Sequence, residues 1–115
     1  MATVSTNGAK IYYESHGVGP TVAFAHGRGG NAASWWQQIP TFSRRYRTIV
    51  FDHRAFGRSL CAAEDFDRNL FDTDLLAILD AESIDKTAII CQSMGGWTGL
   101  RTAVRHPERV SCLIL

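Results

Sequence analysis

The sequence has few cysteines, little net charge and no long apolar run, and each shortage excludes a class of protein. Its three cysteines, Cys61, Cys91 and Cys112, lack the paired spacing of zinc or redox motifs, so we expect reduced cysteines in packing roles. The formal net charge is +1, and no basic block is longer than Arg44-Arg45. This pattern excludes an electrostatic surface for nucleic acid or for an acidic membrane.

Segments that would direct the chain to a membrane or into secretion are also missing. Residues 1–5 contain no basic patch leading into an apolar core, and no apolar run approaches the length of a bilayer span. We therefore predict a soluble, cytoplasmic protein. With 115 residues, 45% hydrophobic and 20% charged, the chain is long enough for at most one small domain. Because it has no repeats or linker-like stretches, we expect residues 1–115 to be one folding unit.

Apolar strand patterns alternate with helical patterns along the chain. Strands are predicted at 10–14, 21–25, 48–51, 86–91 and 110–115, and helical patterns at 31–45, 70–79 and 94–106. Pro40 should kink or divide the first helix, and Pro107 should end the last. This order predicts the α/β class, with a mostly parallel sheet and helices on both faces. The final apolar strand would be an unpaired edge, so we expect more sequence after it.

The most informative motif is a serine between an apolar strand and a glycine-rich helix start. Residues 89–96 read Ile-Ile-Cys-Gln-Ser-Met-Gly-Gly, the pattern of a nucleophile elbow around Ser93. Such a tight turn requires small residues two before and two after the nucleophile, and Cys91 and Gly95 meet this demand. A serine that only caps a helix is the plainer alternative. The apolar strand before Ser93 and a His-Gly turn upstream favour the catalytic interpretation.

Two further motifs follow predicted strands. Residues 26–30 are His-Gly-Arg-Gly-Gly, and residues 52–59 are Asp-His-Arg-Ala-Phe-Gly-Arg-Ser. Together with the serine motif, they resemble the N-terminal half of the α/β-hydrolase superfamily, over residues 8–115. The resemblance implies an α/β-hydrolase fold truncated after about the sixth strand. Residues 1–115 would then be the N-terminal portion of a single domain, with the cap and C-terminal portion absent.

The resemblance also implies roles around the nucleophile. The backbone N–H groups of Arg28 and Met94 would form the oxyanion hole, because they are fixed before negative charge develops on the carbonyl oxygen. His26 and Gly27 would shape the supporting loop, with His26 tying backbone groups together rather than acting as a base. Gly95 would support the elbow.

Several other residues are expected to have mainly structural roles. Loop 52–59 should be architectural, and Ala55 stands where the family has glycine, which costs about 1 kcal/mol if the position needs a positive φ. His53 and His106 are expected to be surface or capping residues. Either Trp35 or Trp36 reaches the pocket, or both pack a helix on the sheet.

Two further expectations concern the helix predicted at 94–106, which follows Ser93. Gly95, Gly96 and Gly99 should let it approach the sheet closely. His106 and Glu108 are the only histidine and acid after Ser93, and the helix length separates them from its hydroxyl, so they cannot form a triad with it.

The resemblance therefore implies that residues 1–115 are the N-terminal part of a serine hydrolase. It would act on an ester, lactone or similar small carbonyl compound through an acyl-enzyme, with no metal or organic cofactor, and residues 1–115 alone should be nearly inactive. A non-catalytic ligand-binding protein on the same fold is the alternative. A naturally short interaction module with an open sheet edge is a third. The sequence leaves the oligomeric state open.

Overall fold

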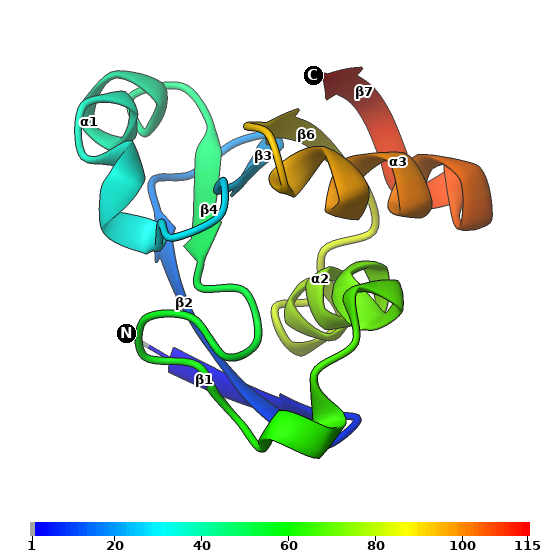
Figure 1. Ribbon diagram of the computed structural model, residues 1–115. Coiled ribbons are helices and arrows are strands. Elements are labelled where there is room, and N and C mark those ends of the chain that lie inside the picture. The colour runs from blue at the N-terminus through cyan, green and yellow to red at the C-terminus, as the bar shows by residue number, and fades with distance from the viewer. Residues whose placement is uncertain (1) are drawn as a thin grey trace.

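The computed structural model describes residues 2–115, which form one mixed sheet covered by helices on both faces (Figure 1). The strands are β1 (Ala2–Thr6), β2 (Ala9–His16), β3 (Thr21–Ala25), β4 (Arg47–Phe51), β5 (Leu60–Cys61), β6 (Thr87–Cys91) and β7 (Val110–Ile114). Their order in the sheet is β1-β2-β4-β3-β6-β7, with β5 paired to β2. Strands β4, β3, β6 and β7 are parallel neighbours, whereas β1, β2 and β5 pair antiparallel. The predicted α/β class is confirmed, and the edge of the sheet that contains β1 and β2 is antiparallel.

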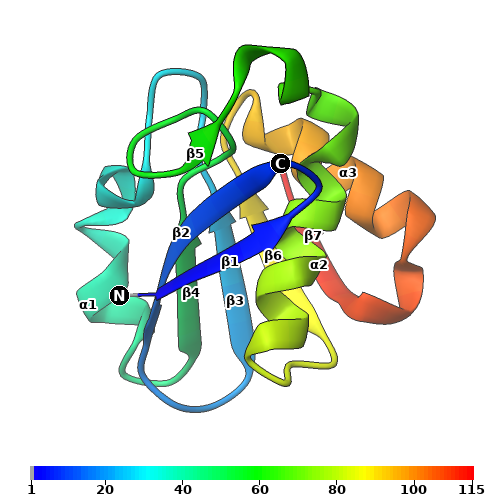
Figure 2. The same cartoon turned by 90° about the horizontal axis from the view of Figure 1, so that it is seen from below.

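The helical segments are short, and several are single 3-10 turns. They are η1 (Ala32–Trp35), α1 (Gln38–Phe42), η2 (Ala63–Asp65), η3 (Arg68–Leu70), α2 (Phe71–Ala81), α3 (Gly95–Arg105) and η4 (Pro107–Arg109). Figures 1 and 2 show α1 on one side of the sheet and α2 with α3 on the other. None of the helices within residues 2–115 is long and apolar enough to cross a membrane.

Alternating side chains of the central strands build a core on each face. Ala23 and Ala25 of β3 pack with α2 residues such as Leu75 in the larger cluster. Val22 and Phe24 face the other way, toward η1 and α1. This alternation follows from the two-residue period of a strand, and it explains why β3 is apolar at nearly every position.

The predicted element order differs from the structure in two details. The pattern at 31–45 is divided, which was one of the two expectations, but the division lies at residues 36–37, and Pro40 lies in the first turn of α1. Proline is tolerated there because N–H groups of the first turn have no helical acceptor. Strands β1 and β5 were not predicted, since β1 has an intermediate and exposed pattern and β5 is two residues long.

The cysteine expectation holds for Cys91 and fails for Cys112. No disulfide links the cysteines of residues 2–115, and Cys91 is buried, whereas Cys112 is exposed on β7. Burial raises the pKa of the Cys91 thiol to about 11, so this thiol is a neutral packing group.

Candidate active site

Ser93 lies in a strained turn between β6 and α3. Its φ is +48°, in the left-handed region that non-glycine residues rarely adopt. The turn is held at both ends: the Gln92 N–H donates to the Ala25 carbonyl at 3.0 Å, and the Gly95 N–H donates to the Gln92 carbonyl at 2.8 Å. The strand–turn–helix context predicted for Ser93 is therefore present, and Ser93 is exposed at the carboxyl end of a central parallel strand.

Close packing of α3 against the sheet explains two of its three glycines. A Cβ atom at Gly95 would overlap the Ala25 carbonyl oxygen, and one at Gly99 would overlap the Cys91 sulfur. At Gly96 the nearest atom would be 3.6 Å away, on Leu115, which is ordinary contact. The expected close approach thus applies to Gly95 and Gly99 and is wrong for Gly96.

The loop after β3 lies against the serine turn. A Cβ atom at Gly27 would be 3.5 Å from the Ser93 Cβ, so the two turns meet at this glycine. The Gly30 N–H donates to the Gly27 carbonyl at 3.0 Å and closes the loop. Within residues 2–115, the backbone N–H groups of Arg28 and Met94 donate to no acceptor of the chain. Two free donors therefore flank the serine.

Ser93 lines a cavity of about 670 Å³ at this edge of the sheet. Its walls are Arg28, Phe56, Phe66, Arg68, Phe71, Ser93, Met94 and Trp97. The cavity thus brings together three of the residues singled out from the sequence, Ser93, Arg28 and Met94. The aromatic lining residues and Arg68 were not predicted from the sequence. Trp97 carried a signal, because it lies four residues after Ser93, in the first turn of the helix that follows the serine.

Neither Trp35 nor Trp36 reaches this cavity. Trp35 packs on Phe24 with ring centroids 4.9 Å apart, and Trp36 is 69% exposed. The packing alternative is confirmed for Trp35 only. The tryptophan that does line the cavity is Trp97.

A buried histidine pair connects the loop after β3 with the loop after β4. The Nε2 atom of His26 accepts the backbone N–H of His53 at 2.9 Å, which leaves the His26 proton on Nδ1. That Nδ1 donates to the Gly27 carbonyl at 2.7 Å. On its other side, His53 Nε2 lies 2.7 Å from the Thr98 hydroxyl of α3. One chain of contacts therefore joins both loops to the helix that follows Ser93.

Burial favours the neutral form of both imidazoles. It lowers the pKa of His26, although the Gly27 bond and the Asp52 charge oppose the shift. Burial and the adjacent His26 lower the pKa of His53 well below its ordinary value. His53 has no exposed surface, so its expected place at the surface is wrong. Parallel strands β3 and β4 end at the same edge, which is why residues just after each strand meet there.

Loop 52–59 is architectural, as expected. The Asp52 carboxylate accepts the backbone N–H groups of Ala32 and Arg58, at 2.6 and 2.7 Å. The Ser59 hydroxyl donates to the Asp52 carbonyl and accepts the Tyr12 N–H. Ala55 does adopt a positive φ, +69°, so the family's glycine position is filled here by a strained alanine.

Arg54 anchors the same loop from inside the protein. Its guanidinium makes two hydrogen bonds to the Asp74 carboxylate of α2, at 2.8 and 2.6 Å, and both side chains are almost fully buried. It also donates to the backbone carbonyls of Asn7 and Asp65. The hydrogen bonds and the charge of Asp74 raise the pKa of Arg54 although burial opposes the shift, so the guanidinium stays charged.

His106 lies at the far end of α3 from Ser93. Its Nε2 is 3.5 Å from the buried Asp72 carboxylate of α2, which Arg101 and Arg105 also approach. A helix of 11 residues spans about 16 Å. Consequently His106 has a structural partner and cannot take the Ser93 proton.

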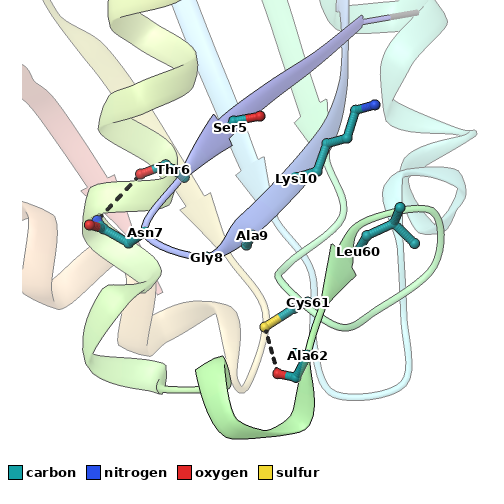
Figure 3. Close-up of a pocket in the computed structure, with 9 residues that line it drawn as sticks. All are labelled: Ser5, Thr6, Asn7, Gly8, Ala9, Lys10, Leu60, Cys61 and Ala62. Atoms are coloured by element: carbon teal, nitrogen blue, oxygen red, sulfur yellow. Dashed lines mark hydrogen bonds between the residues drawn. The ribbon is translucent and has the colours of Figure 1, made fainter.

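A second cavity, of about 530 Å³, lies on the turn between β1 and β2 and beside β5 (Figure 3). Lys10 is its one charged residue, and its Cys61 thiol lies 3.3 Å from the Ala62 carbonyl oxygen. None of its lining residues belongs to the motifs at residues 26–30, 52–59 or 89–96, whereas residues of all three motifs line the Ser93 cavity. The Ser93 cavity is therefore the candidate active site.

Comparison with known proteins identifies the family of the chain. A family model described as the alpha/beta hydrolase fold matches residues 20–115. The chain is 32% identical, over 93% of its length, to a protein of Azorhizobium caulinodans named as a carbamate hydrolase, RutD. It is 34% identical, over 97% of its length, to 2-hydroxy-6-oxo-6-(2'-aminophenyl)hexa-2,4-dienoic acid hydrolase of Metapseudomonas resinovorans. The chain spans 40% of the length of each.

The solved structure of Est816, described as an N-acyl homoserine lactone degrading enzyme, superposes with a TM-score of 0.91. The two sequences are 34% identical, and the match covers 95% of this chain and 42% of Est816.

Proposed function

Because the chain belongs to the alpha/beta hydrolase fold family, we propose that it is the front part of a serine hydrolase with Ser93 as the nucleophile. The observation that carries this proposal is the position of Ser93, exposed in a left-handed turn on the wall of a large cavity. A strained turn is costly, and such strain persists mainly where a function needs the side chain presented. A serine that only caps a helix needs no such turn.

The proposed reaction is acyl transfer in two steps. The Ser93 Oγ attacks the substrate carbonyl carbon, its proton passes to a histidine, and the carbonyl oxygen becomes an oxyanion. Collapse of this intermediate breaks the bond to the leaving group, which takes up the proton, and leaves an acyl-serine. Water then attacks the acyl-serine by the same path and releases the acid.

The oxyanion hole in this proposal consists of the N–H groups of Arg28 and Met94. Two features support it: both donors flank Ser93, and neither has an acceptor within residues 2–115. In a trans peptide the carbonyl and the next N–H point in opposite directions. By holding the Gly27 carbonyl, His26 therefore also fixes the direction of the Arg28 N–H. His26, Gly27 and Gly95 are thus assigned supporting roles.

The histidine and the acid of the triad belong, in this proposal, to sequence outside residues 1–115. Within residues 2–115, His26 and His53 are engaged with each other and with backbone groups, and His106 is at the wrong end of α3. The relatives are more than twice as long as this chain, which gives room for both groups. Residues 1–115 alone should therefore hydrolyse esters at a negligible rate.

The proposed substrate is a small carbonyl compound such as an ester or lactone. Relatives are named for a carbamate, a dienoic acid and a lactone, all of which contain or adjoin an acyl carbon that a serine can attack. A cytoplasmic location, inferred from the sequence, is part of the same proposal.

Covalent capture of Ser93 tests this function. The full-length protein is treated with a fluorophosphonate, and the labelled peptide is identified by mass spectrometry. We expect one label, on Ser93, and loss of both labelling and ester hydrolysis in Ser93→Ala. Ser5→Ala, which changes an exposed serine on β1, is the matched control and should behave as the wild type. Saturable ligand binding without any labelling would instead favour the non-catalytic binding protein.

A further inference from the structure

The cavity at Ser93 carries a positive charge that has no counterpart in its walls. Arg28 and Arg68 both line it, and none of its lining residues is acidic. Within residues 2–115, neither guanidinium lies within 4.0 Å of a carboxylate, whereas the arginines at 47, 54, 101, 105 and 109 all do. Among the described residues, two cations without an ion-pair partner therefore line the cavity of the candidate nucleophile.

Arg68 is held in place by an aromatic ring. Its guanidinium carbon lies 4.7 Å from the centroid of the Trp97 ring, in the first turn of α3. A guanidinium stacked in this way uses its face for the ring, and its N–H groups along the edge stay available to an acceptor. A carboxylate matches that edge, because its two oxygens can accept two parallel N–H bonds.

The remaining walls are flat and apolar. Phe56 and Phe66 have ring centroids 6.5 Å apart, and Phe66 and Phe71 have centroids 6.0 Å apart. These rings, with Trp97, offer faces and edges against which a planar group packs favourably. The cavity therefore combines an apolar, aromatic lining with two cations beside the serine.

We propose that the substrate of this site is an anionic carbonyl compound, in which a flat conjugated or aromatic part carries a carboxylate held by Arg68 and Arg28. This inference rests on the proposed function, because it takes Ser93 as the attacking group. It adds the substrate's charge, which acts in two ways. The carboxylate relieves the repulsion between the two guanidinium groups, and the aromatic walls orient the planar part so that the scissile carbonyl faces Ser93.

A pair of isosteric esters tests the charge preference in the full-length protein. The 4-nitrophenyl esters of 4-carboxybenzoic acid and of 4-carbamoylbenzoic acid share the leaving group and nearly the same size, and differ by one negative charge. We expect kcat/KM to be at least about tenfold higher for the carboxylate ester at low salt, the scale of one charge-assisted hydrogen bond. Added salt should shrink the ratio, because it screens partly exposed charges.

Arginine variants show which residues set that ratio. Arg68→Gln removes the charge and should lower the carboxylate-to-amide ratio of kcat/KM about tenfold. Arg28→Gln should lower it too, since the substitution keeps the backbone N–H and removes only the side-chain charge. Arg44→Gln, an exposed arginine after α1, changes the net charge equally and should leave the ratio as in the wild type.

The outcomes separate this inference from the proposed function. If Ser93→Ala abolishes hydrolysis of both esters but the wild-type ratio is close to one, the serine mechanism holds and the anionic substrate class is wrong. An equal loss on both esters in Arg68→Gln would also contradict the substrate class. If Ser93→Ala retains hydrolysis, the proposed function itself has failed.

Discussion

His53 and His26 contact each other directly inside the protein, with Nδ1 of His53 3.1 Å from Nε2 of His26 and the rings edge to face. Both side chains are fully buried. The pair lies between the Gly27 carbonyl on one side and the Thr98 hydroxyl on the other. The loop that carries Arg28 is thereby tied to the helix that begins after Ser93.

Replacing His26 should impair the chemical step more than substrate binding. In His26→Ala the Gly27 carbonyl loses the imidazole donor and the His53 N–H loses its acceptor. The Arg28 N–H is then less well directed, and loss of one oxyanion donor typically costs about a hundredfold or more in kcat. We expect kcat to fall about tenfold to a hundredfold, with KM nearly unchanged, in steady-state ester hydrolysis by the full-length protein. His16→Ala changes the last residue of β2 and is the control, with a kcat equal to that of the wild type. An unchanged kcat in His26→Ala would remove the positioning role.

The histidine pair should also make the protein less stable in mild acid. Both imidazoles have pKa values lowered by burial, so the unfolded chain binds more protons than the folded one below the ordinary histidine pKa. The stability from these groups is complete above about pH 6.5 and falls as the pH decreases toward the folded-state pKa values, by at most about 1.4 kcal/mol per pH unit for each group.

Urea unfolding at about pH 7.5 and pH 5.5 measures this loss, in a range above the ordinary carboxylate pKa values. His53→Gln should reduce the difference between the two free energies of unfolding, because glutamine does not titrate. If the variant shows the same difference as the wild type, His53 does not contribute to the acid sensitivity.

Removing the partner of the buried Arg54 should be strongly destabilising. Asp74→Asn leaves a charged guanidinium in the interior, and breaking such a pair costs about 3–5 kcal/mol. Asp80→Asn is the matched control, because Asp80 pairs with Arg109 while its side chain is 68% exposed, and it should cost less than about 1 kcal/mol. Urea denaturation of both variants measures the contrast. Equal effects would mean that burial does not decide the weight of these ion pairs.

Two adjacent glycines should respond differently to alanine. Gly95→Ala forces a methyl group into the Ala25 carbonyl, so it should lower the free energy of unfolding by about 1–3 kcal/mol and slow labelling of Ser93. Gly96→Ala meets only ordinary contact and should be neutral or stabilising by up to about 1 kcal/mol, because alanine is the better helix former. Thermal unfolding and the rate of fluorophosphonate labelling report both effects. A tolerated Gly95→Ala would show that α3 can move away from β3 without loss.

Much of the fold near the site could be predicted from local patterns. The predicted strand 21–25 agrees with β3, and the helix predicted at 94–106 differs from α3 by one residue at each end. Strand β1 escaped prediction because Ala2 and Val4 are its only apolar residues and are only partly buried, so its apolar alternation is short and weak. The division of the 31–45 stretch was predicted at Pro40, but it lies at residues 36–37, because proline fits the first turn of α1 and does not end a helix there.

The sequence by itself determined the elements whose physics is local. Strand period, helix period and the small residues at Cys91 and Gly95 are set by neighbours in the chain, and they were enough to predict the turn at Ser93. Only the tertiary structure decided that His53 meets His26, 27 residues away, and that Arg68 stacks on Trp97 beside the serine. Those contacts depend on which parallel strands are neighbours and on how α3 is seated. Local sequence patterns do not predict these long-range contacts, because each contact forms only after the sheet has been assembled.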